Sequence, residues 1–131
     1  MQYGNTVLFV DDVPAVLAFY RSAFGFQTKF YDQEFGFALL DTAGGDIAIA
    51  SHDAGSRMMP GTYRRPDSGH PEGVEIAFYT SDVAAAYDRA TSAGALSLAA
   101  PRKMPWGQTV AYVRSIEGSI IGFCTQPDSL A

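Results

Sequence analysis

Apolar and polar positions follow two different periods along the first fifty residues. Residues 6–12 (TVLFVDD) form a short apolar run that predicts a β-strand. Residues 13–25 (VPAVLAFYRSAFG) place their apolar side chains at helical spacing, which predicts an amphipathic α-helix. Three more strands, separated by turn residues, are predicted at 26–32, 36–41 and 46–51. This stretch therefore reads as one strand, one helix and three strands.

The same order of elements returns seventy residues later. Residues 75–81 (EIAFYTS) predict a strand and residues 82–94 (DVAAAYDRATSAG) a helix. Asp82 stands before this helix where Asp12 stands before the first, and aspartate is a good N-cap residue because its carboxylate accepts hydrogen bonds from free backbone amides. The last three strands are predicted at 95–101, 108–115 and 119–125.

The repeat predicts an α+β fold of two tandem βαβββ modules within a single domain of 131 residues. The first module is expected at about 4–51, an irregular connector at about 52–72, and the second module at about 73–126. Each helix has one apolar face that needs covering, so each should lie on the outer face of a curved four-stranded sheet. The opposite faces of the two sheets would then surround a central hollow.

Composition and charge narrow the range of functions. Hydrophobic residues make up 47% of the chain and charged residues 18%, which is typical of a globular domain. The net charge of −5 provides no cationic field for nucleic acid and favours a cationic ligand. No apolar run approaches the roughly 20 residues that cross a bilayer, and the N-terminus has no signal-peptide features, so we expect a cytoplasmic protein without a membrane partner. Cys124 is the only cysteine and cannot form an intramolecular disulfide.

The doubled layout resembles the vicinal oxygen chelate superfamily of glyoxalases, bleomycin-resistance proteins and dioxygenases. The resemblance rests on VDDVPAVLAFYRSAFGF at 10–26 and on PWGQTVAYVRSIEGSIIGFCT at 105–125, and it is closest to the small bleomycin-resistance-like members. It implies a divalent metal held by one residue from the first and one from the last strand of each module. It also implies a homodimer.

The repeat locates the four metal-ligand positions that the resemblance implies. They are Asn5 and Glu75 in the first strands and Ala48 and Gly122 in the last strands. Ala48 and Gly122 have no donor atom in their side chains, and one amide with one carboxylate is too small a donor set for a catalytic transition metal. We therefore expect no metal and no other cofactor, while a different site with His70 and Glu72 near Glu75 stays conceivable.

Without metal ligands, the hollow becomes a pocket for a small molecule. Small residues at its floor make room, and aromatic walls hold planar or cationic compounds by stacking and cation–π contacts. Strand parity puts either Phe35 or Phe37 in the lining. The predicted ligand-binding residues are Asn5, Phe9, Phe37, Ala48, Glu75, Tyr79, Met104, Trp106, Tyr112 and Gly122.

These observations predict a metal-free protein of the bleomycin-resistance type that sequesters an aromatic or cationic small molecule such as an antibiotic. The alternative is a glyoxalase-class lyase or isomerase that uses a divalent metal or Glu75 as a general base, which makes Glu75 the one candidate catalytic residue. A purely structural role for Glu75 would pair it with Asn5 or Arg114.

Overall fold

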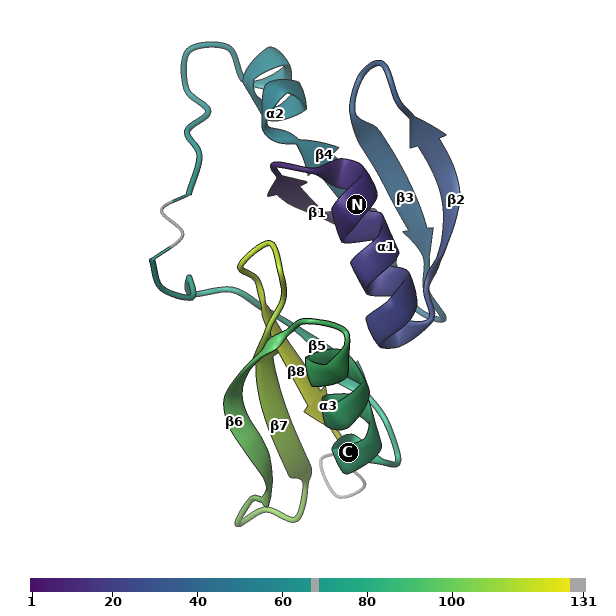
Figure 1. The fold of residues 1–131 in the computed structure, drawn as a ribbon, viewed down its shortest axis with the longest axis vertical. Helices are drawn as coiled ribbons and strands as arrows, with labels where there is room; N and C mark the ends of the chain where they lie inside the picture. Colours follow the sequence, from purple (N-terminus) through teal and green to yellow (C-terminus); the bar gives the residue numbers. More distant parts are fainter. Residues whose placement is uncertain (67–68, 128–131) are drawn as a thin grey trace. The chain divides into compact units, whose positions relative to one another are not determined.

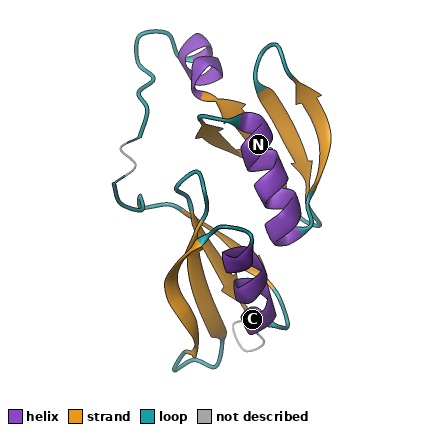
Figure 2. Ribbon diagram, viewed as in Figure 1, coloured by secondary structure: helices purple, strands orange, loops and turns teal. Residues whose placement is uncertain are grey.

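The computed structural model of the chain describes residues 1–66 and 69–127, so residues 67 and 68 of the expected connector lie outside the described residues. The chain divides into two compact units, residues 1–67 and 68–131. Each unit contains a helix packed on a four-stranded mixed sheet, as Figures 1 and 2 show. The predicted α+β fold of two tandem βαβββ modules is therefore confirmed.

The first unit has the predicted order of elements. Its sheet has the strand order β1-β4-β3-β2, with β1 parallel to β4 and the other pairs antiparallel. The elements are β1 (Asn5–Val10), α1 (Val13–Phe24), β2 (Gln27–Asp32), β3 (Phe37–Asp41) and β4 (Asp46–Ser51).

Local sequence signals set both ends of α1. The Asp12 carboxylate accepts a hydrogen bond of 3.0 Å from the Ala15 backbone N–H, as expected of an N-cap. Gly25 ends the helix with φ of 77°, a left-handed conformation that a residue with a side chain adopts only at a cost. The helix then packs on the sheet through its buried side chains Val13, Val16, Leu17, Phe19, Tyr20 and Ala23.

The expectation of an irregular connector is wrong at its start. Residues His52–Met58 form a further helix, α2, which follows β4 directly and contacts β1 and β4. The Ser51 hydroxyl caps it by accepting a hydrogen bond of 3.0 Å from the Ala54 N–H. A helix of seven residues is too short to show a helical apolar period, which explains why the pattern did not reveal it.

The second unit repeats this topology. Its strand order is β5-β8-β7-β6, with β5 parallel to β8 and the other pairs antiparallel. Helix α3 packs on β6, β7 and β8. The elements are β5 (Glu75–Tyr79), α3 (Val83–Ser92), β6 (Leu96–Lys103), β7 (Thr109–Arg114) and β8 (Ile120–Cys124).

The strand register separates the two faces of each sheet. In β4, Ile47 and Ile49 are buried core residues, and alternation turns Ala48 to the opposite face, where it lies between Val7 and Leu39. In β8, Ile121 and Phe123 are the buried pair, and Gly122 is turned to the opposite face in the same way. No helix in the described parts of the chain is long and apolar enough to span a membrane.

Candidate functional site

One face of the second sheet brings together three of the predicted site residues. Gly122 lies beside Ala77 in β5 and opposite Tyr112 in β7. A Cβ atom placed on Gly122 would overlap Oε2 of Glu75 and would lie 3.2 Å from a ring carbon of Tyr112. The Glu75 carboxylate therefore lies over the bare backbone of Gly122, next to the Tyr112 ring. The Glu75 carboxylate occupies the space that the missing side chain of Gly122 leaves.

Glu75 is an exposed residue, and no hydrogen bond or ion pair to its carboxylate is found among residues 1–66 and 69–127. The cationic partner considered for it, Arg114, donates hydrogen bonds elsewhere. Its Nε–H donates to the Gly118 carbonyl at 3.1 Å, and one terminal nitrogen donates to the His70 carbonyl at 3.3 Å. Among the described residues, no cationic side chain therefore lies at hydrogen-bond distance from the Glu75 carboxylate.

The pKa of the Cys124 thiol depends on the charge of Glu75. The thiol lies on the same strand face as Gly122, two residues further along β8, and next to Tyr79. Burial raises the pKa of the Cys124 thiol, and the negative charge of Glu75 raises it further, because both disfavour the thiolate. The pKa of this thiol, the only one in the chain, therefore depends on where the Glu75 carboxylate lies.

Trp106 stands in the loop between β6 and β7, at the end of the sheet that holds Tyr79 rather than Glu75. Its indole N–H donates a hydrogen bond of 2.8 Å to the side chain of Gln108, whose own amide donates to the Thr125 carbonyl at 2.7 Å. The ring is anchored at its nitrogen while 53% of the residue stays exposed, so it can stack on a flat ligand. Tyr79 is exposed as well, whereas Met104 in the same loop is half-buried.

The other predicted residues lie in the first sheet. Phe9 and Phe37 both pair with Ala50, from opposite sides, whereas Phe35 lies in the turn before β3. Ala48 lies on the same face of this sheet but is fully buried, and Asn5 at the start of β1 is exposed. A hollow shared by these residues and those of the second sheet stays a prediction.

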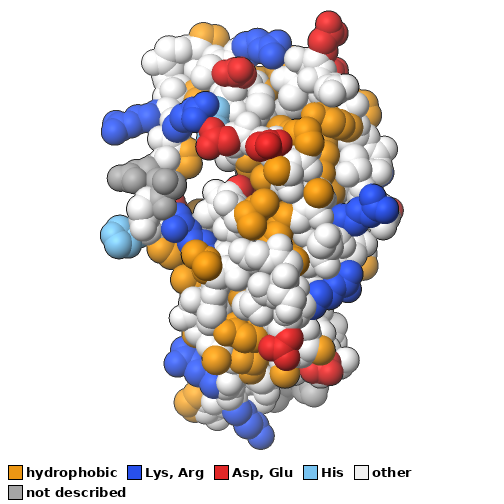
Figure 3. Space-filling view, in the orientation of Figure 1, with side chains coloured by type: hydrophobic (Ala, Val, Ile, Leu, Met, Phe, Trp, Pro, Cys, Tyr) orange, Lys and Arg blue, Asp and Glu red, His pale blue; other side chains and the backbone are white. Residues whose placement is uncertain are grey.

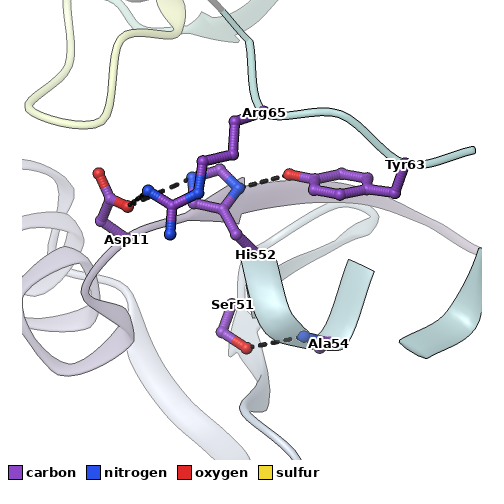
Figure 4. A network of polar contacts seen from close by, with 6 residues as sticks. All are labelled: Asp11, Ser51, His52, Ala54, Tyr63 and Arg65. Atoms are coloured by element: carbon purple, nitrogen blue, oxygen red, sulfur yellow. Dashed lines mark hydrogen bonds and ion pairs between the residues drawn. The ribbon is translucent and has the colours of Figure 1, made fainter. Parts of the chain in front are cut away.

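Sequence reasoning missed a polar cluster in the first unit, drawn in Figure 4. His52 is only 8% exposed, and its Nδ1 is hydrogen-bonded to the hydroxyl of Tyr63. Its Nε2 faces Oδ1 of Asp11 at 3.7 Å, and the same oxygen receives a hydrogen bond of 2.6 Å from Arg65. The Tyr63 ring packs against Phe9, with centroids 5.3 Å apart. The cluster ties residues 63–65 to the start of α2 and the end of β1.

Charges and burial set the protonation states of this cluster. Burial lowers the pKa of His52 and Arg65 lowers it further, against the opposing effects of Asp11 and Asp53. Burial raises the pKa of the Tyr63 hydroxyl. At neutral pH the histidine is therefore neutral and the tyrosine protonated, so that the Tyr63 O–H donates to Nδ1 and the His52 Nε2–H points to Asp11.

The shift in His52 predicts a loss of stability in acid. Because its folded-state pKa is below the ordinary value of 6.5, the unfolded chain binds more protons, and the free energy of unfolding should fall as the pH drops through 6.5. The fall ends once the pH is below the folded-state pKa. Denaturant titrations between pH 8 and 4 should show a weaker pH dependence for His52→Gln than for the wild type. His70→Gln, which removes the exposed second histidine, is the control and should behave as the wild type.

A groove of about 360 Å³ opens in the first unit, and none of the ten predicted ligand-binding residues lines it. Acidic side chains lie interspersed with Lys and Arg side chains on the upper part of the face drawn in Figure 3, over this unit. The guanidinium of Arg57 stacks over the Phe35 ring at 4.7 Å, at one wall of the groove. The charged residues in its lining are Asp11, Asp12, Glu34, Asp53 and Arg57.

The chain has two βαβββ modules in tandem. In each, the first and last strands pair in parallel and a helix covers one face of the sheet. This is the architecture of the vicinal oxygen chelate proteins. The chain belongs to the Glyoxalase/Bleomycin resistance protein/Dioxygenase superfamily, whose family profile matches residues 2–123. No curated protein matches the sequence significantly.

Solved structures share the fold at low sequence identity. A glyoxalase-related enzyme from Fulvimarina pelagi is 21% identical with a TM-score of 0.82, over 97% of this chain and 89% of that one. A glyoxalase/bleomycin resistance protein/dioxygenase family enzyme from Burkholderia phytofirmans PsJN is 22% identical with a TM-score of 0.77, over 93% and 96%. A lactoylglutathione lyase from Agrobacterium tumefaciens is 18% identical with a TM-score of 0.74, over 99% and 97%. Such identities show the fold alone.

The side chains at the implied metal positions do not fit a metal centre. A donor side chain on Gly122 would collide with Glu75, and Ala48 offers only a methyl group. In the described part of the chain, no group of three or more His, Cys, Asp or Glu residues is arranged to hold a metal ion. His70 and Glu72, the other site considered, belong to no such group among the described residues, and both are exposed. The function proposed below therefore involves no metal.

Proposed function

We propose that this chain is a metal-independent small-molecule-binding protein of the bleomycin-resistance type, which sequesters an aromatic or cationic compound. The observation that carries the proposal is the exposed residue Glu75, whose carboxylate lies over Gly122 without a cationic side chain of the described residues at hydrogen-bond distance. Glu75 is the one ionisable group among the four metal-ligand positions that the family resemblance implies.

The surroundings of Glu75 suit a positively charged aromatic ligand. The Tyr112 ring lies beside the carboxylate, and a cation bound there would meet a charge and an aromatic face together. Cation–π contacts are worth about 0.5–2 kcal/mol, and the net charge of −5 adds a long-range attraction. Binding to the carboxylate needs no proton transfer and no metal.

The test is a titration of the purified protein with cationic aromatic compounds, such as acridinium and phenanthridinium dyes, beside neutral analogues of similar shape. Calorimetry measures the affinity, and the fluorescence of Trp106, the only tryptophan, reports binding near its loop. Glu75→Gln keeps the shape of the side chain and removes its charge. We expect this variant to bind the cationic probes at least tenfold more weakly, which is about 1.4 kcal/mol.

Two matched variants control this experiment. Glu72→Gln removes the same charge from an exposed residue three positions earlier, and Glu34→Gln removes one from the groove of the first unit. Both should bind as the wild type does. If all three variants bind the cationic probes equally weakly, the effect comes from the net charge and not from Glu75 in particular. If the purified protein holds one equivalent of a transition metal through Glu75, the proposed metal independence is wrong.

A further inference from the structure

Gly122 occupies a place where a strand gains nothing from glycine. It lies in the interior of β8, paired with both β5 and β7, and glycine weakens such a strand because it packs no side chain and is flexible when unfolded. Its φ is not positive, unlike that of Gly118 in the preceding turn, so its backbone conformation is open to any residue. The requirement for glycine must come from the space around it.

That space is filled by one side chain in particular. A Cβ atom on Gly122 would overlap the Glu75 carboxylate, whereas the Tyr112 ring carbon 3.2 Å away would have to shift by only a few tenths of an ångström. We propose that Gly122 is a positioning residue, whose missing side chain forms the seat that holds the Glu75 carboxylate flat on the second sheet. The consequence for ligand binding rests on the function proposed above, in which Glu75 is the anionic anchor.

The seat makes position 122 a determinant of specificity. Any side chain there competes with the carboxylate for the same volume. Glu75 is exposed, and its carboxylate is the far end of a flexible chain, so an alanine at 122 should push it into solvent and leave the sheet intact. In this variant the negative charge of Glu75 would no longer be held over the sheet, and the preference for cationic ligands would be lost.

Cys124 allows the seat to be tested without any ligand. Its thiol pKa is raised by burial and by the seated carboxylate. The rate of alkylation by iodoacetamide, measured against pH, gives the thiol's titration because only the thiolate reacts. Moving the carboxylate away should shift this profile to lower pH.

The experiment compares four proteins: the wild type, Glu75→Gln, Gly122→Ala and the double variant. We expect Glu75→Gln and Gly122→Ala each to shift the alkylation profile to lower pH, and the double variant to shift no further than Glu75→Gln. The cationic probes should bind at least tenfold more weakly to either single variant, with no additional loss in the double. Gly73→Ala is the control, because a Cβ at Gly73 meets nothing within 4 Å.

Each outcome decides a separate point. A wild-type alkylation profile in Gly122→Ala, with a shifted one in Glu75→Gln, would overturn the seat. If the wild type binds no cationic probe while both profiles shift, the seat stands and the proposed function fails. If Gly122→Ala melts early, the same change is made in a Glu75→Ala background. In that background, Gly122→Ala should no longer lower the melting temperature. If it lowers the melting temperature as much as in the wild type, the clash involves another residue and the proposal is overturned.

Discussion

Ile121→Ala is expected to lower the free energy of unfolding by about 2–5 kcal/mol. Ile121 is 0% exposed and lies in the middle of β8, between Ile76 and Val113 of the neighbouring strands. Shortening it removes three carbon atoms from a packed interior and leaves a cavity that the flanking strands cannot close. Equilibrium denaturation in urea, followed by circular dichroism and by Trp106 fluorescence, measures the change.

The internal repeat provides a replicate and a control for this prediction. Ile47 is the counterpart of Ile121 in β4 and is also buried, with 5% of it exposed, and Ile47→Ala should cost a similar amount. Ile116 is 47% exposed, so Ile116→Ala should stay within about 0.5 kcal/mol of the wild type. A loss below 1 kcal/mol in both buried variants would mean that these isoleucines do not form the cores of their units.

The elements could be predicted because their signals are local. Asp12 and Gly25 mark the ends of α1 by conformations and hydrogen bonds that involve only neighbouring residues. The alternation of Ile47, Ala48 and Ile49 assigns the two faces of β4 without knowledge of its partners. The repeat then carries that assignment from one module to the other.

The candidate site could be predicted only in part, because its contacts join residues far apart in sequence. The repeat treats Ala48 and Gly122 as equivalent, and both do lie on the predicted face. Their surroundings differ, however, because Glu75 occupies the space over Gly122, and the direction of one flexible side chain is not encoded in strand periodicity. The burial of His52 was equally hidden, since it depends on a tyrosine eleven residues further along a segment without a regular period.

Tyr63→Phe is expected to destabilise the protein by about 1–3 kcal/mol near neutral pH. The change keeps the ring, and with it the packing on Phe9 and the close approach to Gly55, where a Cβ would lie 2.9 Å from a ring carbon. It removes only the hydroxyl that satisfies Nδ1 of His52. Without the hydroxyl, Nδ1 of His52 is buried with no hydrogen-bond donor, and nothing offsets the cost of removing it from water. The free energy of unfolding should therefore fall by more than it does when an exposed hydrogen bond is lost.

Two comparisons isolate this hydrogen bond from other effects of the substitution. Tyr87→Phe removes a hydroxyl that donates to Ser97 at 2.6 Å in an exposed pair, and should cost no more than about 0.5 kcal/mol. In a His52→Leu background there is no acceptor to leave unsatisfied, so Tyr63→Phe should cost much less than in the wild type. An equal cost in both backgrounds, measured by urea denaturation at pH 7.5, would show that Tyr63 acts through its ring alone. The hydrogen bond between His52 and Tyr63 would then contribute nothing to holding Tyr63 in place, and the packing of its ring on Phe9 and the ion pair of Arg65 with Asp11 would hold residues 63–65.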